Sequence, residues 1–312
     1  MGERPLAGCR VLITGAAGAF GSATSAALRA RGARVVGLDV VSPPGAEEQI
    51  IRCDLSDDAA VAESVTQAVE RLGGLDVLVN NAGVGLPTDS GAPIDEAVRR
   101  TVEVNLLGAW RTTVAALPHL LRSPDPRAVF VSSGLAFVTV PFASAYTVTK
   151  RGISAYADCL RIEYGSRLKV TTVYPGYVRT PIHEASRRAG VTLEGKVPAE
   201  RVEDVVGTLL RVIAAERPPR DTGTTRSGGF AIRLGRMLPA LVDRVVLARH
   251  RRDLARGEYD GVPLAERMAR LLAGRGDHES AARARARNSS AGETSGAGTG
   301  TGTIPQQGEE LS

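Results

Sequence analysis

Short apolar runs alternate with longer stretches of helical character through the first two thirds of the chain. The apolar runs at 9–14, 33–39, 50–55, 76–80, 128–133 and 169–174 predict buried strands. Helices are predicted between them: an alanine-rich one that ends near Arg31, then 57–72, 93–119 and 144–168. This alternation predicts an α/β fold, a Rossmann-type doubly wound parallel sheet with helices on both faces.

The turn after the first predicted strand is rich in glycine and reads T-G-A-A-G-A-F-G over residues 14–21. A strand, a glycine turn and a helix in this order suit a dinucleotide pyrophosphate. Glycines let the backbone approach the phosphates, and the helix N-terminus supplies N–H donors. The alternative is an ordinary tight turn.

Two aspartates follow the next predicted strands. Asp39 falls at the end of the second strand, where a carboxylate can accept hydrogen bonds from the adenosine ribose hydroxyls and repel a 2′-phosphate. No lysine or arginine lies within 16–20 or 40–42, so the sequence favours NAD over NADP. Asp54 ends the third strand, where it can meet the adenine amino group. The alternative for Asp39 is a solvated loop aspartate.

A serine, a tyrosine and a lysine carry the candidate chemistry. Tyr146 and Lys150 are four residues apart, which places them on one face of a helix. A lysine ammonium beside a phenol favours the phenolate and lowers a pKa that starts at about 10, so Tyr146 becomes a usable general acid or base. Ser133 is expected to end the preceding strand, facing the same substrate oxygen. Tyr146 and Lys150 on a solvated helix surface are the alternative.

Two asparagine segments also stand out. After the fourth predicted strand, residues 80–83 read N-N-A-G, where amides can hold neighbouring strand ends together and small residues make room for a cofactor. Asn105 falls in the middle of a predicted helix, although asparagine is a poor mid-helix residue. Its amide could bend the helix or hold a water, and a solvent-facing asparagine is the alternative.

Composition and charge exclude several classes of protein. The 312 residues are 43% hydrophobic, as in soluble globular proteins, and no run of apolar residues is long enough to span a membrane. Cys9, Cys53 and Cys159 are too widely spaced for a metal site and predict no disulfide, which favours a reducing, cytoplasmic compartment. The net charge of +5 is uneven, because residues 217–287 hold 16 arginines against 8 acidic residues. Little aromatic interleaving argues against a nucleic-acid partner.

Taken in order, these residues resemble the short-chain dehydrogenase/reductase family, in its common NAD(P)-dependent oxidoreductase group. The resemblance covers about residues 9–215 and rests on residues 14–21, Asp39, Asp54, residues 80–83, Asn105, Ser133, Tyr146, Lys150, and the P-G-Y-V-R-T run at 175–180. It implies an NAD(P)-dependent oxidoreductase that interconverts a secondary alcohol and a ketone. It also implies a homo-oligomer.

The resemblance implies a role for each matching residue. Tyr146 is the general acid/base, Ser133 orients and polarises the carbonyl or alcohol, and Asn105 supports a proton-relay water. Lys150 binds the nicotinamide ribose and lowers the Tyr146 pKa. The cofactor-binding set is Thr14, Gly15, Gly18, Phe20, Gly21, Asp39, Asp54, Leu55, Asn81, Ala82, Gly83, Tyr146, Lys150, Pro175, Gly176, Val178 and Thr180.

The glycine turn departs from the group's usual T-G-x-x-x-G-x-G. Ala19 replaces the middle glycine, and the spacing instead resembles a branch of the family that modifies sugar nucleotides. The N-N-A-G and P-G-x-V-x-T runs favour the common dehydrogenase group, so Ala19 bears on cofactor affinity more than on fold. Two other functions stay open: a catalytically idle NAD-binding scaffold or sensor, and a sugar-nucleotide epimerase or dehydratase.

Apolar residues are expected to line the substrate pocket. The predicted wall consists of Leu135, Phe137, Val138, Val140, Pro141 and Phe142, with Val84 and Leu86 facing the same cleft. Residues 181–197 are expected to form a lid whose polar groups are His183, Glu184, Arg187 and Arg188. Apolar walls with polar groups at the rim predict a hydrophobic substrate, such as a steroid, a lipid or a polyketide-like compound.

The C-terminal third differs from the rest of the chain. Apolar residues recur at helical spacing, flanked by arginines, at Leu234, Met237, Leu238, Leu241, Val242, Val245 and Val246. We expect a single domain over 1–275 with a helical extension at about 230–274, including a short helix at 263–273. The extension packs on the substrate side or on a dimer partner, or contacts a membrane surface through 233–252. Residues 276–312 are predicted to be a disordered tail.

Overall fold

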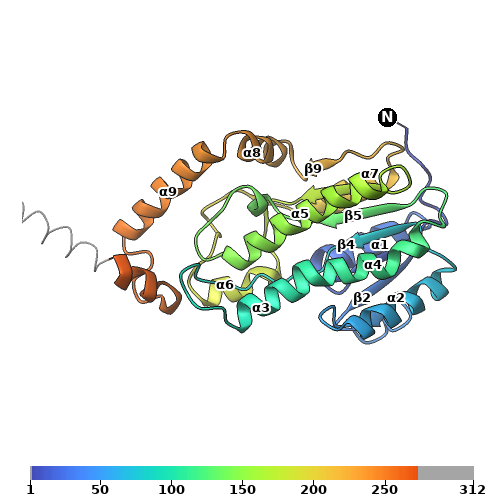
Figure 1. Cartoon of the computed structure of the whole chain (residues 1–312), viewed down its shortest axis with the longest axis horizontal. Coiled ribbons are helices and arrows are strands. Elements are labelled where there is room, and N and C mark those ends of the chain that lie inside the picture. Colours follow the sequence, from blue (N-terminus) through green and yellow to red (C-terminus); the bar gives the residue numbers. More distant parts are fainter. Residues whose placement is uncertain (1, 273–312) are drawn as a thin grey trace, which may run out of the picture. The chain divides into compact units, whose positions relative to one another are not determined.

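A computed structural model describes residues 2–272 and contains a seven-stranded sheet in the order β3-β2-β1-β4-β5-β6-β9. Every neighbouring pair of its strands is parallel. The strands are β1 (Arg10–Thr14), β2 (Arg34–Asp39), β3 (Ile50–Arg52), β4 (Val77–Asn80), β5 (Arg127–Val131), β6 (Lys169–Tyr174) and β9 (Asp221–Gly223). The predicted doubly wound fold is confirmed (Figure 1).

Helices connect these strands. They are α1 (Ala19–Arg29), α2 (Asp58–Leu72), α3 (Glu96–Val102), α4 (Gly108–Leu120), α5 (Ser144–Tyr164), α6 (Glu184–Arg188), α7 (Val202–Ala214), α8 (Arg226–Met237) and α9 (Pro239–Ala255). A second, two-stranded sheet pairs β7 (Tyr177–Val178) with β8 (Ala199–Glu200). The sequence did not predict β7, β8 or β9, because two or three residues show no periodicity. The chain divides into two units, Met1–Glu266 and Arg267–Ser312, and every element named here belongs to the first.

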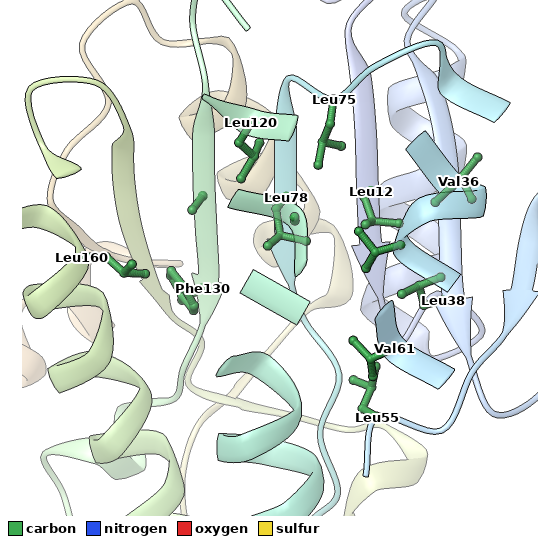
Figure 2. Close-up of a cluster of buried hydrophobic side chains, with 14 of the residues drawn as sticks. Leu12, Val36, Leu38, Leu55, Val61, Leu75, Leu78, Leu120, Phe130 and Leu160 are labelled. Carbon is green, nitrogen blue, oxygen red and sulfur yellow. The ribbon is translucent and has the colours of Figure 1, made fainter. Parts of the chain in front are cut away.

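Successive strand residues point to opposite faces of the sheet, and both faces are buried. Leu12, Leu78 and Phe130 belong to a core shared with α2, α4 and α5 (Figure 2). Their strand neighbours belong to a second core with α1 and α7, formed in part by Val11, Ile13, Val77, Val79, Val129 and Val131. Near-continuous apolar runs in the sequence therefore report burial on both sides.

The predicted helix over 93–119 is helical without a gap from α3 to α4, but it starts later than expected and contains a π-helical turn. Asp95 caps α3 by accepting a 2.9 Å hydrogen bond from the Val98 N–H, so the helix starts there rather than at Pro93. Between α3 and α4, residues Glu103–Leu107 form a π-helix with Asn105 at its centre. π-bulges of this kind often occur at functional sites.

The predicted amphipathic helix through 234–246 is broken. The α8 helix ends at Met237, Leu238 has non-helical dihedrals (φ −131°, ψ 57°), and Pro239 is the first residue of α9. Proline has no N–H to continue the preceding helix and restricts the residue before it, which explains the break. Helical turns also run over 263–272, while the predicted tail at 276–312 lies outside the described residues. Within residues 2–272, the helices are too short or too polar to cross a membrane.

Candidate active site

A cleft of about 770 Å³ opens at the carboxyl ends of β1 and β4. The strand order reverses at this point, and doubly wound sheets bind ligands in the crevice so formed. Ten residues of the predicted cofactor set line the cleft: Gly15, Gly18, Phe20, Asp39, Asp54, Leu55, Asn81, Ala82, Gly83 and Thr180. Thr14, Gly21, Lys150, Pro175, Gly176 and Val178 do not line it, and Tyr146 lines an adjoining pocket instead.

Two glycines of the turn at 14–21 leave no room for a side chain. Gly15 has a φ of +67°, and a Cβ there would lie 2.8 Å from the Ala82 Cα. At Gly21 a Cβ would lie 2.0 Å from the Gly15 carbonyl oxygen. Gly18 is less constrained, because its nearest contact would be 3.3 Å. The turn therefore depends on Gly15 and Gly21, whatever occupies the cleft.

Thr14 and Asn81 join the ends of β1 and β4, as the sequence suggested for the N-N-A-G run. The Thr14 hydroxyl accepts hydrogen bonds of 3.0 Å from the backbone N–H groups of Asn81 and Ala82. The Asn81 amide donates in return to the carbonyls of Thr14 at 2.9 Å and Gly15 at 3.2 Å. Thr14 thus supports the cleft from behind.

Asp39 lies at the end of β2 and lines the cleft, as expected. Its carboxylate accepts hydrogen bonds from the backbone N–H groups of Ala17 at 2.9 Å and Val41 at 3.1 Å. The same side chain therefore braces the glycine turn. Its remaining lone pairs are available to a ligand hydroxyl.

Asp54 is held by a neighbour that the sequence analysis did not single out. The Arg100 guanidinium contacts its Oδ2 at 3.2 Å, and Ser56 donates to Oδ1 from its N–H and its hydroxyl. The Ser56 N–H makes the largest contribution to lowering the Asp54 pKa. Arg188 also lines the cleft and pairs with Glu184 at 3.0 Å. Both arginines lie far in sequence from the segments that were searched for a phosphate-binding cation.

Ser133, Tyr146 and Lys150 come together beside this cleft. Ser133 lies just beyond β5 and accepts a 3.2 Å hydrogen bond from the Leu135 N–H. The Lys150 Nζ donates to the Val131 carbonyl at 3.0 Å and lies 5.6 Å from the centre of the Tyr146 ring. The four-residue spacing on α5 therefore places both side chains on one face, as predicted.

The Tyr146 pKa moves in the opposite direction to the one expected. Burial raises the pKa of Tyr146 to about 12, against a smaller lowering by the Ser133 hydroxyl. Burial also lowers the pKa of Lys150 to about 8. Removing both groups from water penalises their charged forms, and here this outweighs the attraction between them.

Asn105 is fully buried, which excludes the solvent-facing alternative. Its amide oxygen accepts from the Val84 N–H at 2.7 Å, and its amide nitrogen donates to the Val84 carbonyl at 3.0 Å. A Cβ on Gly83 would lie 3.3 Å from both the Asn105 Oδ1 and the Lys150 Nζ. The side chain of Asn105 therefore holds the loop at 83–84 beside Lys150.

A smaller pocket of about 50 Å³ adjoins the cleft and shares Gly85, Leu86 and Ile182 with it. Its wall contains Tyr146 and the predicted residues Leu86, Leu135, Val140, Pro141 and Phe142. Val84 lines the larger cleft instead, and Val138 lines neither. Phe137 does not line either cavity: it packs against Tyr174 with ring centres 5.3 Å apart and lies under Arg236.

The segment at 181–197 covers this pocket. His183, Ser186, Val191, Thr192 and Leu193 contribute to the lining, and the last four had not been singled out from the sequence. The His183 ring lies 4.7 Å from the Tyr177 ring, and burial lowers its pKa. Among the described residues, no carboxylate, lysine or arginine lines the pocket.

Comparisons with known proteins identify the protein family to which the chain belongs. The family model described as short chain dehydrogenase matches residues 10–190, and the chain therefore belongs to the short-chain dehydrogenase/reductase family of oxidoreductases. Oxidoreductase UcpA of Escherichia coli is 31% identical over 243 residues, covering 70% of this chain and 92% of its own.

Two solved structures extend the comparison. A 3-ketoacyl-(acyl-carrier-protein) reductase from Brucella melitensis, complexed with NADH, is 25% identical with a TM-score of 0.62. It covers 71% of this chain and 99% of its own. A short-chain dehydrogenase from Burkholderia cenocepacia in complex with NADP has a TM-score of 0.66 at 23% identity, covering 78% and 99%, and shares the fold. Relatives of this fold thus hold either cofactor.

Proposed function

We propose that this protein is an NAD(P)-dependent oxidoreductase that interconverts a secondary alcohol and a ketone, with Tyr146 as the general acid/base. The observation that carries the proposal is the meeting of Ser133, Tyr146 and Lys150 where the large cleft adjoins the small apolar pocket. The cleft suits a dinucleotide, because it lies at the switch point and passes the N-terminus of α1.

A bound nicotinamide would supply or accept the hydride. The chain's own residues manage the proton. In the reducing direction the Tyr146 phenol donates a proton to the carbonyl oxygen, and the Ser133 hydroxyl hydrogen-bonds to the same oxygen as charge develops on it. The Lys150 ammonium stabilises the phenolate that remains. Because burial raises the Tyr146 pKa to about 12, the phenol is protonated near neutral pH, which favours reduction there.

For the cofactor we propose NAD in preference to NADP. Asp39 at the end of β2 would accept hydrogen bonds from the ribose hydroxyls and repel a 2′-phosphate. The cleft also holds Arg100 and Arg188, but each already contacts a carboxylate, Asp54 and Glu184 respectively. A 2′-phosphate would therefore compete with these carboxylates for either arginine.

The substrate we propose is a hydrophobic alcohol or ketone, of a steroid-, lipid- or polyketide-like kind. Support comes from the apolar wall formed by Leu86, Leu135, Val140 and Phe142, and from the neutral polar groups of the lid. A pocket of about 50 Å³ is far smaller than such a compound, so the segment at 181–197 must move for one to bind.

Turnover tests this proposal directly. The purified protein is mixed with NADH or NADPH and a panel of aliphatic, bicyclic, steroid and charged keto-acid substrates, while the absorbance of the reduced cofactor is followed. Oxidation of the reduced cofactor in the presence of an apolar ketone supports the proposal if it is lost in Tyr146→Phe. Cofactor binding without turnover would favour an idle scaffold or sensor. A UDP-sugar is assayed separately by product analysis, because an epimerase or dehydratase returns its cofactor unchanged, and conversion of that compound alone would favour such an enzyme.

We also propose that the protein is a cytoplasmic homo-oligomer. The compartment is proposed from the small number and wide spacing of the cysteines, Cys9, Cys53 and Cys159. Apolar side chains are exposed on α4 and α5, where Val114 is 57% and Ile162 86% accessible, and such a surface suits a second copy of the chain. Size-exclusion chromatography with light scattering tests this, and Ile162→Glu should dissociate the assembly.

A membrane contact through 233–252 is a further part of the proposal. Met237, Leu238, Leu241 and Val245 are exposed around the junction of α8 and α9, and arginines flank them. An exposed apolar stripe with basic neighbours suits an anionic bilayer surface. Sedimentation with phosphatidylserine vesicles, compared with phosphatidylcholine vesicles, tests it. Equal absence of binding to both would contradict it.

A further inference from the structure

The chain beyond α9 returns to the substrate pocket, although it lies outside the region that the family model matches. Tyr259, in the turn after α9, packs its ring against Phe142, with ring centres 5.4 Å apart at 64°. Phe142 is buried and lines the substrate pocket. Tyr259 therefore lies behind the part of the pocket wall that Phe142 forms.

Phe142 has an unusual backbone that depends on its surroundings. Its φ of 60° makes it the one non-glycine residue with positive φ in the described part of the chain. Bulky side chains rarely adopt this region, and such strain persists only where neighbouring structure enforces it. On one side, the Thr88 N–H donates to the Phe142 carbonyl at 2.9 Å. On the other, the Tyr259 ring supports its side chain.

The same turn also holds the lid. Lys196, within the segment at 181–197, forms ion pairs with Glu258 and with the buried Asp253, the latter at 3.7 Å. Its Nζ lies 5.7 Å from the centre of the Tyr259 ring. Gly190 has a φ of +74°, and a Cβ there would lie 3.2 Å from a methyl group of Val262. Glu258, Tyr259 and Val262 of this turn thus lie against the lid at Lys196 and Gly190, and Asp253 of α9 adds a second ion pair to Lys196.

We infer that Tyr259 is a specificity-determining residue, which limits the size of the substrate by supporting Phe142 and anchoring the lid through Lys196. This inference rests on the proposed function, because it assigns a substrate to the pocket beside Tyr146. Compact ketones fit while the turn stays in place. Bulky ketones can bind only if Phe142 and the lid move away from the pocket. The packing of Tyr259 against Phe142 and Lys196 opposes that movement.

The test compares two ketones of different bulk, 2-butanone and trans-1-decalone, in the full-length protein with NADH. Removing the ring in Tyr259→Ala should raise kcat/KM for decalone relative to butanone by about ten-fold, the equivalent of one well-packed aromatic contact. Tyr259→Phe keeps the ring and should retain the original ratio. The matched control is Leu247→Ala, on an exposed position of α9.

A second measurement does not depend on turnover. Hydrogen exchange in the segment at 181–197 should become several-fold faster in Tyr259→Ala and in Lys196→Met, and stay unchanged in Leu247→Ala. An unchanged ratio together with unchanged exchange would overturn the inference. If no ketone is reduced by any variant while exchange still accelerates, the proposed function fails and the support of the lid by Tyr259 stands.

Discussion

The Lys150 ammonium lies 5.6 Å from the centre of the Tyr146 ring, and its nearest hydrogen-bond partner is the backbone carbonyl of Val131 at 3.0 Å. This carbonyl belongs to the last residue of β5, so the sheet itself fixes the position of the cation. The phenol and the ammonium are therefore neighbours at one site, without a direct hydrogen bond between them.

Tyr146→Phe should reduce turnover by roughly 10² to 10⁴-fold, the usual range for losing a general acid/base. Cofactor affinity should change little, because the ring remains and Tyr146 does not line the large cleft. Steady-state kinetics and fluorescence titration with NADH measure the two quantities. Tyr164→Phe, at the far end of α5, is the control and should behave like the unmodified protein. A fully active Tyr146→Phe protein would contradict the assignment.

The two reaction directions should respond differently to pH. With the pKa of Tyr146 at about 12, the phenol stays protonated through neutrality, so kcat/KM for ketone reduction should be level there. It should fall above about pH 8, where Lys150 loses its proton. Alcohol oxidation needs the phenolate and should rise with pH through neutrality. Parallel pH profiles in both directions would argue against this, and Lys150→Met should remove the fall near pH 8.

The free energy of unfolding should depend on pH through the ionisation of Asp76. Burial by itself would raise the Asp76 pKa, but hydrogen bonds from Arg10 and Ser123 outweigh it and lower the pKa to about 2. A depressed carboxyl pKa contributes stability above its unfolded value of about 4, and that stability is lost as pH falls through about 2. Asp76→Asn should therefore lower the free energy of unfolding at neutral pH by about 2 kcal/mol.

Urea unfolding at neutral pH and near pH 3 measures this effect. The two proteins should differ less at the lower pH, because Asp76 of the unfolded chain, with a pKa of about 4, is largely protonated there while the folded protein keeps it ionised. Asp58→Asn is the control: Asp58 pairs with Arg111 but is 83% exposed, and exposed pairs contribute little. An Asp76→Asn protein as stable as the unmodified one would show that the Arg10 pair is energetically neutral.

Asp39→Ala combined with Val40→Arg should shift cofactor preference towards NADP. The change removes the carboxylate at the end of β2 and places a cation where a 2′-phosphate would lie. Affinity for both cofactors should also weaken somewhat, because Asp39 accepts a hydrogen bond from the Ala17 N–H and so braces the glycine turn. The ratio of kcat/KM for NADPH to that for NADH is the measurement. An unmodified protein that already prefers NADPH would refute the interpretation of Asp39.

The sequence alone was sufficient for the fold class and for most strand positions. Apolar runs such as 9–14 indicate strands buried on both faces. The helix predicted over 57–72 matches α2, where the Asp57 side chain caps the first turn by accepting hydrogen bonds from the Ala59 and Ala60 N–H groups. Gly21 belongs to the same category, because a Cβ there would meet the Gly15 carbonyl oxygen within the same turn. These features depend on local periodicity, capping and steric size.

Other features depended on contacts between distant segments. Asn105 of the π-helix is hydrogen-bonded to Val84, in a loop more than twenty positions earlier in the chain. Arg100 of α3 forms an ion pair with Asp54, which follows β3. Phe137 packs on Tyr174 instead of lining the pocket because α8 is its neighbour. The position of Tyr259 behind Phe142 likewise required the chain to return after α9. Such pairings are set by packing and desolvation in three dimensions, which a one-dimensional pattern of apolar and polar residues does not record.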